Sequence, residues 1–256
     1  MKIIVLLKRT FDTEEKITLS NGIIQDSNVE FIINPYDEYA IEEAIQLRDA
    51  HGGEVTVVTV GEEEAEKQLR TALAMGADEA VLINVEEDLD DIDQYGTATI
   101  LAKYLEDKEV DLILAGNVTV DGGTGQIGPR VADLLELNCI TTVTKVSIDG
   151  ENVEVVRDSE GDLETLQTKL PLVLTTQQGL NEPRYPSLPG IMKAKKKPLK
   201  EIELDDLDLD GSLRKTNVKN ITLPPTKQAG RIFEGEISEQ VKELVQTLST
   251  KVNIQQ

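Results

Sequence analysis

Short runs of β-branched and aliphatic residues alternate with amphipathic segments from residue 2 to about residue 147. Successive parallel strands of one sheet must be joined by crossovers, which are usually helices. The alternation therefore predicts a doubly wound, Rossmann-like α/β fold, in which helices cover both faces of a parallel sheet. The predicted strands are residues 2–7, 54–60, 79–85, 111–116 and 139–148.

Four helices are predicted between these strands, and local signals place the ends of the first two. Asp37 is in a position to cap the first helix, and the pair Gly52-Gly53 can end it. Acidic residues favour the start of the second helix near residue 62, and Gly76 is expected to end it. The third and fourth helices are predicted at about 94–107 and about 124–136.

The pattern changes after residue 149. Residues 148–158 and 162–170 predict two antiparallel strands joined by a short turn, and residues 171–176 predict a further strand. Between residues 177 and 198 there are four prolines, which indicate a segment that is neither regular helix nor central strand. The predicted fold is thus a parallel sheet with an antiparallel hairpin extension.

We divide the chain into two parts. Residues 1–198 form the α/β nucleotide-binding domain, including the antiparallel extension and the proline-rich segment. Residues 199–256 have too few apolar side chains to fold alone, and a helix is expected at 236–250. We therefore predict a C-terminal arm that packs on a partner subunit.

The composition excludes several functions. A net charge of −22 opposes binding to nucleic acid or to anionic membranes, which call for basic surfaces. A single cysteine, Cys139, and a single histidine, His51, leave no intramolecular disulfide and no conventional metal site. No apolar run reaches the roughly 20 residues of a membrane helix. We expect a soluble, cytoplasmic protein with no membrane insertion.

Gly123, Gly125 and Gly128 form a Gly-x-Gly-x-x-Gly pattern after the fourth predicted strand. A P-loop is excluded because no lysine follows, and a dinucleotide fingerprint would instead follow the first strand. Two interpretations remain: a plain tight turn, or a loop and helix start that bind one phosphate group. The second is favoured because several strand ends converge there in an open parallel sheet.

Asn34 and Pro35 stand just before the first helix and also have two interpretations. Asn34 is able to hydrogen-bond an adenine edge or a ribose, and Pro35 fixes the loop. Alternatively, the two residues only lead into the helix.

Four segments, in the expected order, resemble the β subunits of electron-transfer flavoproteins: "NPYDEYAIEEA" (34–44), "RTALAMGADEAVLI" (70–83), "VDGGTGQIGPRVA" (120–132) and "LNEPRYPSLPGIMKAKKKP" (180–198). The resemblance implies a heterodimer of α and β subunits that carries electrons, with no catalytic residue of its own. FAD would lie mainly in the α subunit, and AMP would lie in the β subunit.

Carried over by motif, the resemblance assigns an AMP pocket to the loops of this chain. Tyr36 also stands where the family has an aromatic residue near the flavin of the partner. The implied cofactor-binding residues are Leu6, Asn34, Pro35, Tyr36, Asp37, Val60, Asn117, Val118, Asp121, Gly122, Gly123, Thr124, Gly125, Gln126, Ile127 and Gly128.

The proline-rich segment is implied to dock flavin dehydrogenases, such as acyl-CoA dehydrogenases of fatty-acid β-oxidation, and electrons then pass to a quinone oxidoreductase. Leu188, between Pro186 and Pro189, would be presented at a stiffened loop tip, so that little entropy is lost on docking. The nearby lysines would steer acidic partners. The implied docking residues are Glu182, Arg184, Tyr185, Leu188, Pro189, Ile191, Met192, Lys193, Lys195, Lys196 and Lys197.

Two alternatives stay open at this point. Some members of the family bifurcate electrons and hold a second FAD in place of AMP, and the same glycine loop suits either ligand. A free-standing adenine-nucleotide-binding sensor without flavin has a similar fold, although it would not need an exposed leucine beside a lysine run.

Overall fold

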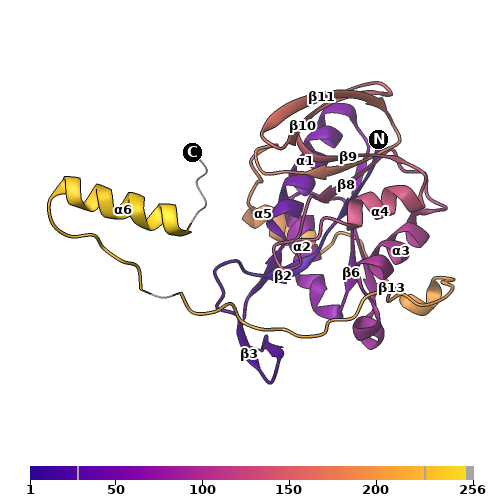
Figure 1. Cartoon of the computed structure of the whole chain (residues 1–256). Coiled ribbons are helices and arrows are strands. Elements are labelled where there is room, and N and C mark those ends of the chain that lie inside the picture. Colours follow the sequence, from indigo (N-terminus) through magenta and orange to yellow (C-terminus); the bar gives the residue numbers. More distant parts are fainter. Residues whose placement is uncertain (28, 228, 252–256) are drawn as a thin grey trace.

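The computed structural model describes residues 1–27, 29–227 and 229–251, and a nine-stranded sheet lies at its centre (Figure 1). The order of the strands across the sheet is β11-β10-β9-β12-β8-β1-β6-β7-β13. Their bounds are β1 Lys2–Leu6, β6 Glu54–Gly61, β7 Glu79–Asn84, β8 Leu112–Gly116, β9 Asn138–Asp149, β10 Asn152–Ser159, β11 Asp162–Lys169, β12 Leu172–Thr176 and β13 Leu199–Glu203.

Seven neighbouring strands of the sheet are parallel: β9, β12, β8, β1, β6, β7 and β13. β10 and β11 form an antiparallel hairpin at the edge next to β9. The chain builds β6 and β7 on one side of β1 and then β8 and β12 on the other. This reversal of direction at β1 is the switch point of a doubly wound sheet. The predicted fold class is therefore confirmed.

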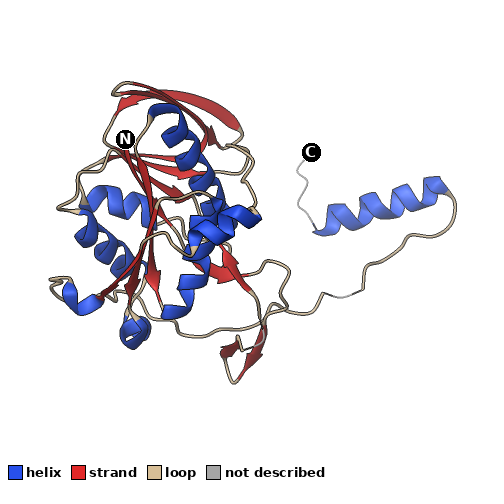
Figure 2. Ribbon diagram, turned by 180° about the vertical axis from the view of Figure 1, so that it is seen from behind, coloured by secondary structure: helices blue, strands red, loops and turns tan. Residues whose placement is uncertain are grey.

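Helices cover both faces of the sheet, as Figure 2 shows from behind. Ile3 and Val5 of β1 pack in one core cluster, while Ile4 and Leu6 pack in another, because successive side chains of a strand point to opposite faces. The first cluster includes α1 (Pro35–His51) and α2 (Glu66–Met75). The second includes α3 (Gln94–Leu105) and α4 (Ile127–Leu134).

The predicted helix ends are partly confirmed. Gly52 follows the last residue of α1 and Gly76 the last residue of α2, both with positive φ. Asp37 as the cap of α1 is wrong: Asn34 occupies the N-cap position, and Asp37 lies inside the first turn. The reason is Pro35, whose fixed φ suits the first helical position and whose missing N–H needs no acceptor there.

The expectation that residues 177–198 contain no regular helix is also wrong, because Leu188–Ala194 form the short helix α5. The hydroxyl of Ser187 accepts a hydrogen bond from the Gly190 N–H at 3.1 Å and caps this helix. Pro189 lies in the first turn, where a proline is tolerated. Leu188 is thus the first residue of a helix and not a loop tip.

Smaller elements complete the fold. Two small two-stranded sheets lie outside the main sheet, and short 3-10 helices follow β6, β7 and β13. Their bounds are β2 Arg9–Phe11 with β5 Phe31–Ile33, β3 Thr18–Ser20 with β4 Ile23–Gln25, η1 Glu63–Ala65, η2 Glu86–Asp91 and η3 Leu204–Asp206.

The chain after residue 198 first adds β13 to the edge of the sheet beside β7 and later forms α6 (Ile237–Lys251), which confirms the predicted helix. In Figure 1, α6 (yellow) stands away from the sheet at the end of an extended stretch. Residues 252–256 of the predicted arm lie outside the described residues. Among the described helices, none is long and apolar enough to span a membrane.

Candidate functional site

A cavity of about 280 Å³ opens at the carboxyl ends of β1, β6 and β8. This is the switch point, where open α/β sheets bind their ligands. Val58 and Val60 line one wall, and the loop after β8 lines another. The predicted residues that line the cavity are Leu6, Asp37, Val60, Asn117, Val118, Gly122, Thr124, Gly125, Gln126 and Ile127. The predicted residues Asn34, Pro35, Tyr36, Asp121, Gly123 and Gly128 do not line it.

Glycine is needed at the three positions of the pattern for different physical reasons. Gly123 and Gly125 have φ values of 62° and 60°, in the left-handed region that favours glycine. A Cβ atom on Gly128 would lie only 2.5 Å from the Cγ2 atom of Thr175, so this glycine lets α4 approach β12 closely. The pattern thus combines two turn positions with one packing position.

The start of α4 faces the cavity without a side-chain cap. Gln126 is the N-cap residue, and its side chain accepts no hydrogen bond from the first-turn N–H groups. Its Oε1 atom accepts hydrogen bonds from the Arg130 guanidinium instead, at 2.8 and 2.9 Å. Ile127 and Gln126 both line the cavity. The first N–H groups of α4 and the positive end of its dipole therefore suit an anion.

Asn34 is fully buried, and its side chain binds only to protein groups. Its Nδ2 group donates to Asp37 Oδ1 and to the carbonyl oxygen of Val118, both at 2.9 Å, and its Oδ1 atom accepts from the Val120 N–H at 3.1 Å. With these bonds Asn34 fixes the loop after β8. It positions the cavity wall and does not face into the cavity.

The carboxyl of Asp37 joins α1 to the ends of two strands. It accepts hydrogen bonds from the Lys8 N–H at 2.7 Å and the Gly116 N–H at 3.0 Å. A Cβ atom on Gly116 would lie 2.3 Å from Asp37 Oδ1, so only glycine fits beside this carboxyl. Burial raises the pKa of Asp37 to about 7, although the donated hydrogen bonds of Asn34, Lys8 and Gly116 act in the opposite direction.

This raised pKa predicts a pH dependence of stability. The folded state takes up a proton on Asp37 below about pH 7, whereas the unfolded state does so only near 3.8, so the contribution of Asp37 is fully present at low pH and decreases as the pH rises towards 7. Between pH 5 and pH 8 the loss is expected to be about 2 to 3 kcal/mol. Denaturant titrations of the wild type and Asp37→Asn at both pH values test it. Between pH 5 and pH 8 the free energy of unfolding of the wild type should fall by about 2 to 3 kcal/mol more than that of the variant. Equal losses contradict the prediction.

Two side chains at the cavity were missed by the sequence analysis. Lys8 is the only basic residue among those that line the cavity in the described chain, and its Nζ atom pairs with Asp121 Oδ2 at 2.6 Å. One indication of this role was present in the sequence, because Lys8 stands directly after the first predicted strand. Asp121 itself does not line the cavity, but it holds this ammonium group and stands directly before the glycine loop in the sequence.

Asp93, the second missed residue, is the N-cap of α3 and accepts hydrogen bonds from the N–H groups of Tyr95 and Gly96. Its other carboxyl oxygen accepts from Lys215 and Thr216 of the arm. Burial alone would raise the pKa of Asp93, but the donors from Thr216, Lys215 and Gly96 hold it well below its usual range. Asp93 therefore fixes residues 215–216 of the arm beside the cavity.

The predicted docking residues divide into exposed and bound side chains. Tyr185 and Leu188 are 94% and 80% exposed, and Ile191 and Met192 are also exposed. Lys193, Lys195, Lys196, Glu182 and Pro189 are exposed as well. Lys197 differs, because its ammonium donates to the carbonyl oxygens of Leu73 and Ala77 at the end of α2. Arg184 binds to Glu42 of α1.

Comparison with known proteins shows the family of the chain. A profile of the electron transfer flavoprotein domain matches residues 21–207. The chain is 62% identical over 256 residues to the electron transfer flavoprotein subunit beta of Bacillus subtilis (strain 168), covering 99% of this chain and 100% of that protein. It is 41% identical to that of Thermoanaerobacterium thermosaccharolyticum (98% and 99% covered) and 37% identical to that of Homo sapiens (90% and 91% covered). The chain belongs to the family of electron transfer flavoprotein beta subunits.

Proposed function

We propose that this protein is the β subunit of a heterodimeric electron carrier and that it holds AMP in the cavity at the end of β1. The observation that carries the proposal is the convergence of the glycine loop, the uncapped start of α4 and Lys8 on one cavity. An anionic phosphate suits this arrangement, because the start of α4 offers N–H groups without a side-chain cap, and Lys8, which is paired with Asp121, brings a basic side chain to the same cavity.

The size and walls of the cavity support a mononucleotide. Its volume of about 280 Å³ is near the lower end of the roughly 300–1,000 Å³ of small-molecule pockets. A dinucleotide such as FAD has about twice as many atoms as AMP. The side chains of Val58, Val60 and Leu101 provide an apolar wall for a planar base. AMP is therefore favoured over a second FAD.

The redox chemistry is assigned to FAD bound mainly by the α subunit, and the flavin supplies the electron-accepting group of the complex. This chain acts by binding and positioning. Tyr36, half-buried in the first turn of α1, is assigned to the neighbourhood of that flavin. The arm packs on the α subunit. Leu188 and the exposed lysines dock flavin dehydrogenases such as acyl-CoA dehydrogenases, and the complex passes the electrons on to a quinone oxidoreductase.

The nucleotide content of the purified complex tests the proposal. The chain is co-expressed with its α subunit, the complex is denatured, and the released nucleotides are counted by chromatography. One FAD and one AMP per heterodimer are expected. Two FAD and no AMP would indicate a bifurcating carrier, and a chain that neither associates nor carries flavin would be a nucleotide-binding sensor.

Two glycine variants locate the nucleotide in this experiment. Gly125→Val should lose the AMP and keep the FAD, because a Cβ atom on Gly125 meets the Asn117 carbonyl oxygen at 3.1 Å, in the wall of the cavity. Gly150→Val, in the turn between β9 and β10, is the matched control: it has the same φ of 60°, hence the same backbone strain of about 1–3 kcal/mol, but a Cβ atom on Gly150 meets nothing within 4 Å and Gly150 does not line the cavity. If Gly125→Val keeps as much AMP as the wild type, the nucleotide does not lie at this loop.

A further inference from the structure

The docking segment, residues 180–198, is attached to α1 by two neighbouring carboxylates. Arg184 binds Glu42 with its Nε at 2.7 Å and its Nη2 at 2.9 Å, and the Arg184 N–H donates to the same carboxylate at 3.2 Å. Asn181 donates to Glu43 Oε2 at 3.0 Å and to the carbonyl oxygen of Tyr39 at 3.1 Å. Five hydrogen bonds thus hold the beginning of the segment.

The Glu42 side chain is buried in this contact between α1 and the docking segment. Glu42 is 4% exposed, so no docking protein can touch it directly. Burial alone would raise the pKa of Glu42, but the hydrogen bonds of Arg184 reverse this effect and lower it. A buried carboxylate is costly unless it is paired and hydrogen-bonded. The fork of Arg184 satisfies both oxygens of Glu42, which a lysine could not do.

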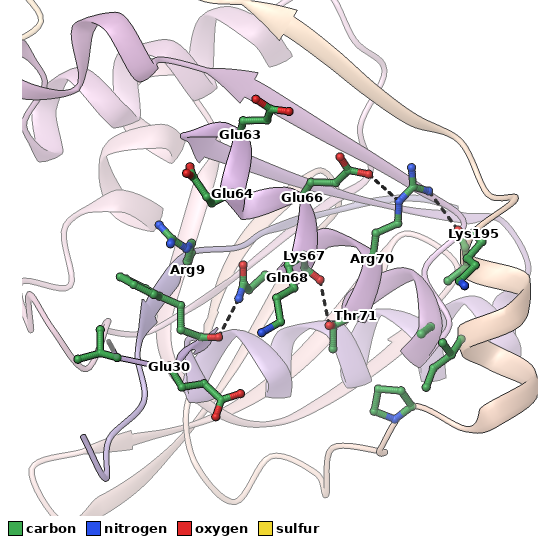
Figure 3. A pocket seen from close by; sticks show the side chains of 16 residues that line it. Arg9, Glu30, Glu63, Glu64, Glu66, Lys67, Gln68, Arg70, Thr71 and Lys195 are labelled. Atoms are coloured by element: carbon green, nitrogen blue, oxygen red, sulfur yellow. Dashed lines mark hydrogen bonds and ion pairs between the residues drawn. The ribbon is translucent and has the colours of Figure 1, made fainter. Parts of the chain in front are cut away.

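The other end of the segment is attached to α2, as Figure 3 shows from close by. Arg70 extends from α2 between Glu66 and the segment: its Nε donates to Glu66 at 3.0 Å, and its Nη1 donates to the carbonyl oxygens of Ala194 and Lys197. Gly190 packs so closely on α2 that a Cβ atom there would lie 2.5 Å from the Ala74 carbonyl oxygen. Helix α5 is therefore fixed at its end and along its inner side.

Between these attachments the segment exposes Tyr185, Leu188 and Met192. We propose that Arg184 and Glu42 form a positioning pair, which holds the start of the segment so that Leu188 is presented in one orientation; this inference rests on the proposed docking function. Arg184 then acts through Leu188 and not as a contact of its own. Because α1 also carries Asp37 at the cavity wall, the same helix sets the position of the docking segment relative to the nucleotide site.

Hydrogen exchange of the purified complex tests the pair without any redox partner. In Glu42→Gln and Arg184→Gln, the amides of residues 185–194 should exchange roughly tenfold faster than in the wild type, because local opening governs exchange. The amides of β1 and β8 should be unchanged. Unaltered exchange in residues 185–194 in both variants would overturn the proposal.

Kinetics then test whether the pair acts through Leu188. The probe is a purified acyl-CoA dehydrogenase that reduces the flavin of the complex. Each variant should raise the Michaelis constant for the complex about three- to tenfold with little change in kcat, because an unpositioned segment must be ordered on docking. In a Leu188→Ala background, Arg184→Gln should add almost nothing.

Controls separate this role from a general loss of stability and from the docking function itself. Arg157→Gln removes an Arg–Glu pair from the β10–β11 hairpin and should leave the Michaelis constant unchanged. If Arg184→Gln and Leu188→Ala have additive effects, Arg184 is a direct contact and the positioning role is wrong. If Leu188→Ala has an effect and Glu42→Gln has none, only the positioning role fails. If none of the variants has an effect, the docking function fails as well.

Discussion

A chain that ends at residue 216 is expected not to assemble with its α subunit, while its α/β domain stays folded. The sheet is complete at Glu203, and Asp93 still binds Lys215 and Thr216 in the shortened chain. What is removed is the extended stretch and α6, which project from the domain (Figure 1).

The expected loss of affinity is large because α6 carries an exposed apolar stripe. Ile237, Val241, Leu244, Val245 and Leu248 recur at helical spacing and are all exposed. If a partner covers the stripe, about five aliphatic side chains leave water, which contributes on the order of 5 kcal/mol. Affinity for the α subunit should then fall more than about 1,000-fold. Size-exclusion chromatography of co-expressed chains measures it, with circular dichroism to confirm that the shortened domain is folded.

Point variants in α6 separate the stripe from the rest of the arm. The double variant Val241→Asp and Leu244→Asp should reproduce the loss of assembly, because it places two carboxylates in the apolar contact. Gln246→Asp and Thr250→Asp add the same charge on the opposite side of α6 and should assemble normally. If the short chain or the first variant still forms a stable heterodimer, the arm does not pack on the α subunit through this stripe.

Leu188→Ala is expected to slow reduction of the complex by an acyl-CoA dehydrogenase while leaving the flavin spectrum and the heterodimer unchanged. Leu188 is 80% exposed at the first position of α5. The backbone beside it is fixed by the Ser187 cap, which binds the Gly190 N–H. A leucine that enters a partner pocket contributes about 2 to 3 kcal/mol, or roughly 30- to 150-fold in the Michaelis constant. Little of this is lost to ordering, because the helix is already held on α2.

The matched control for this variant is Leu163→Ala in the β10–β11 hairpin. Leu163 is also an exposed leucine, but it lies in β11 at the edge of the sheet, whereas α5 packs on α2. Steady-state reduction of wild type, Leu188→Ala and Leu163→Ala should show the loss only in the second. A wild-type rate for Leu188→Ala would show that the docking role assigned to this leucine is wrong.

The sequence predicted the elements of the sheet well because their signals are local. Strand runs and helix faces repeat over a few residues, and Gly52 and Gly76 end their helices at the predicted positions. Strand β13, which pairs with β7, was not predicted, because residues 199–203 were assigned to the arm. Two further errors, both at helix starts, came from proline chemistry. Pro35 moved the cap of α1 to Asn34, and Pro189 began a helix where the prolines predicted none. In both cases a proline took the first turn, the one part of a helix that does not need its N–H group.

The candidate site was predicted as a set of loops but not as a set of contacts. The glycine pattern, the strand ends and the segments that resemble the family are all continuous pieces of sequence, so they identified the loops at the cavity. They missed Lys8 and Asp93, whose importance depends on neighbours from other parts of the chain. They also assigned Asn34 to a ligand, although its side chain binds the loop after β8.

The sequence by itself determined the doubly wound fold, the loops that line the cavity and the family. Only the tertiary structure decided which polar groups meet: Asn34 with Val120, 86 residues apart, and Glu42 with Arg184, 142 residues apart. The physical reason is the range of the forces. Hydrophobic periodicity and turn geometry act within a few residues, whereas the partner of a buried carboxylate is fixed by how whole elements pack.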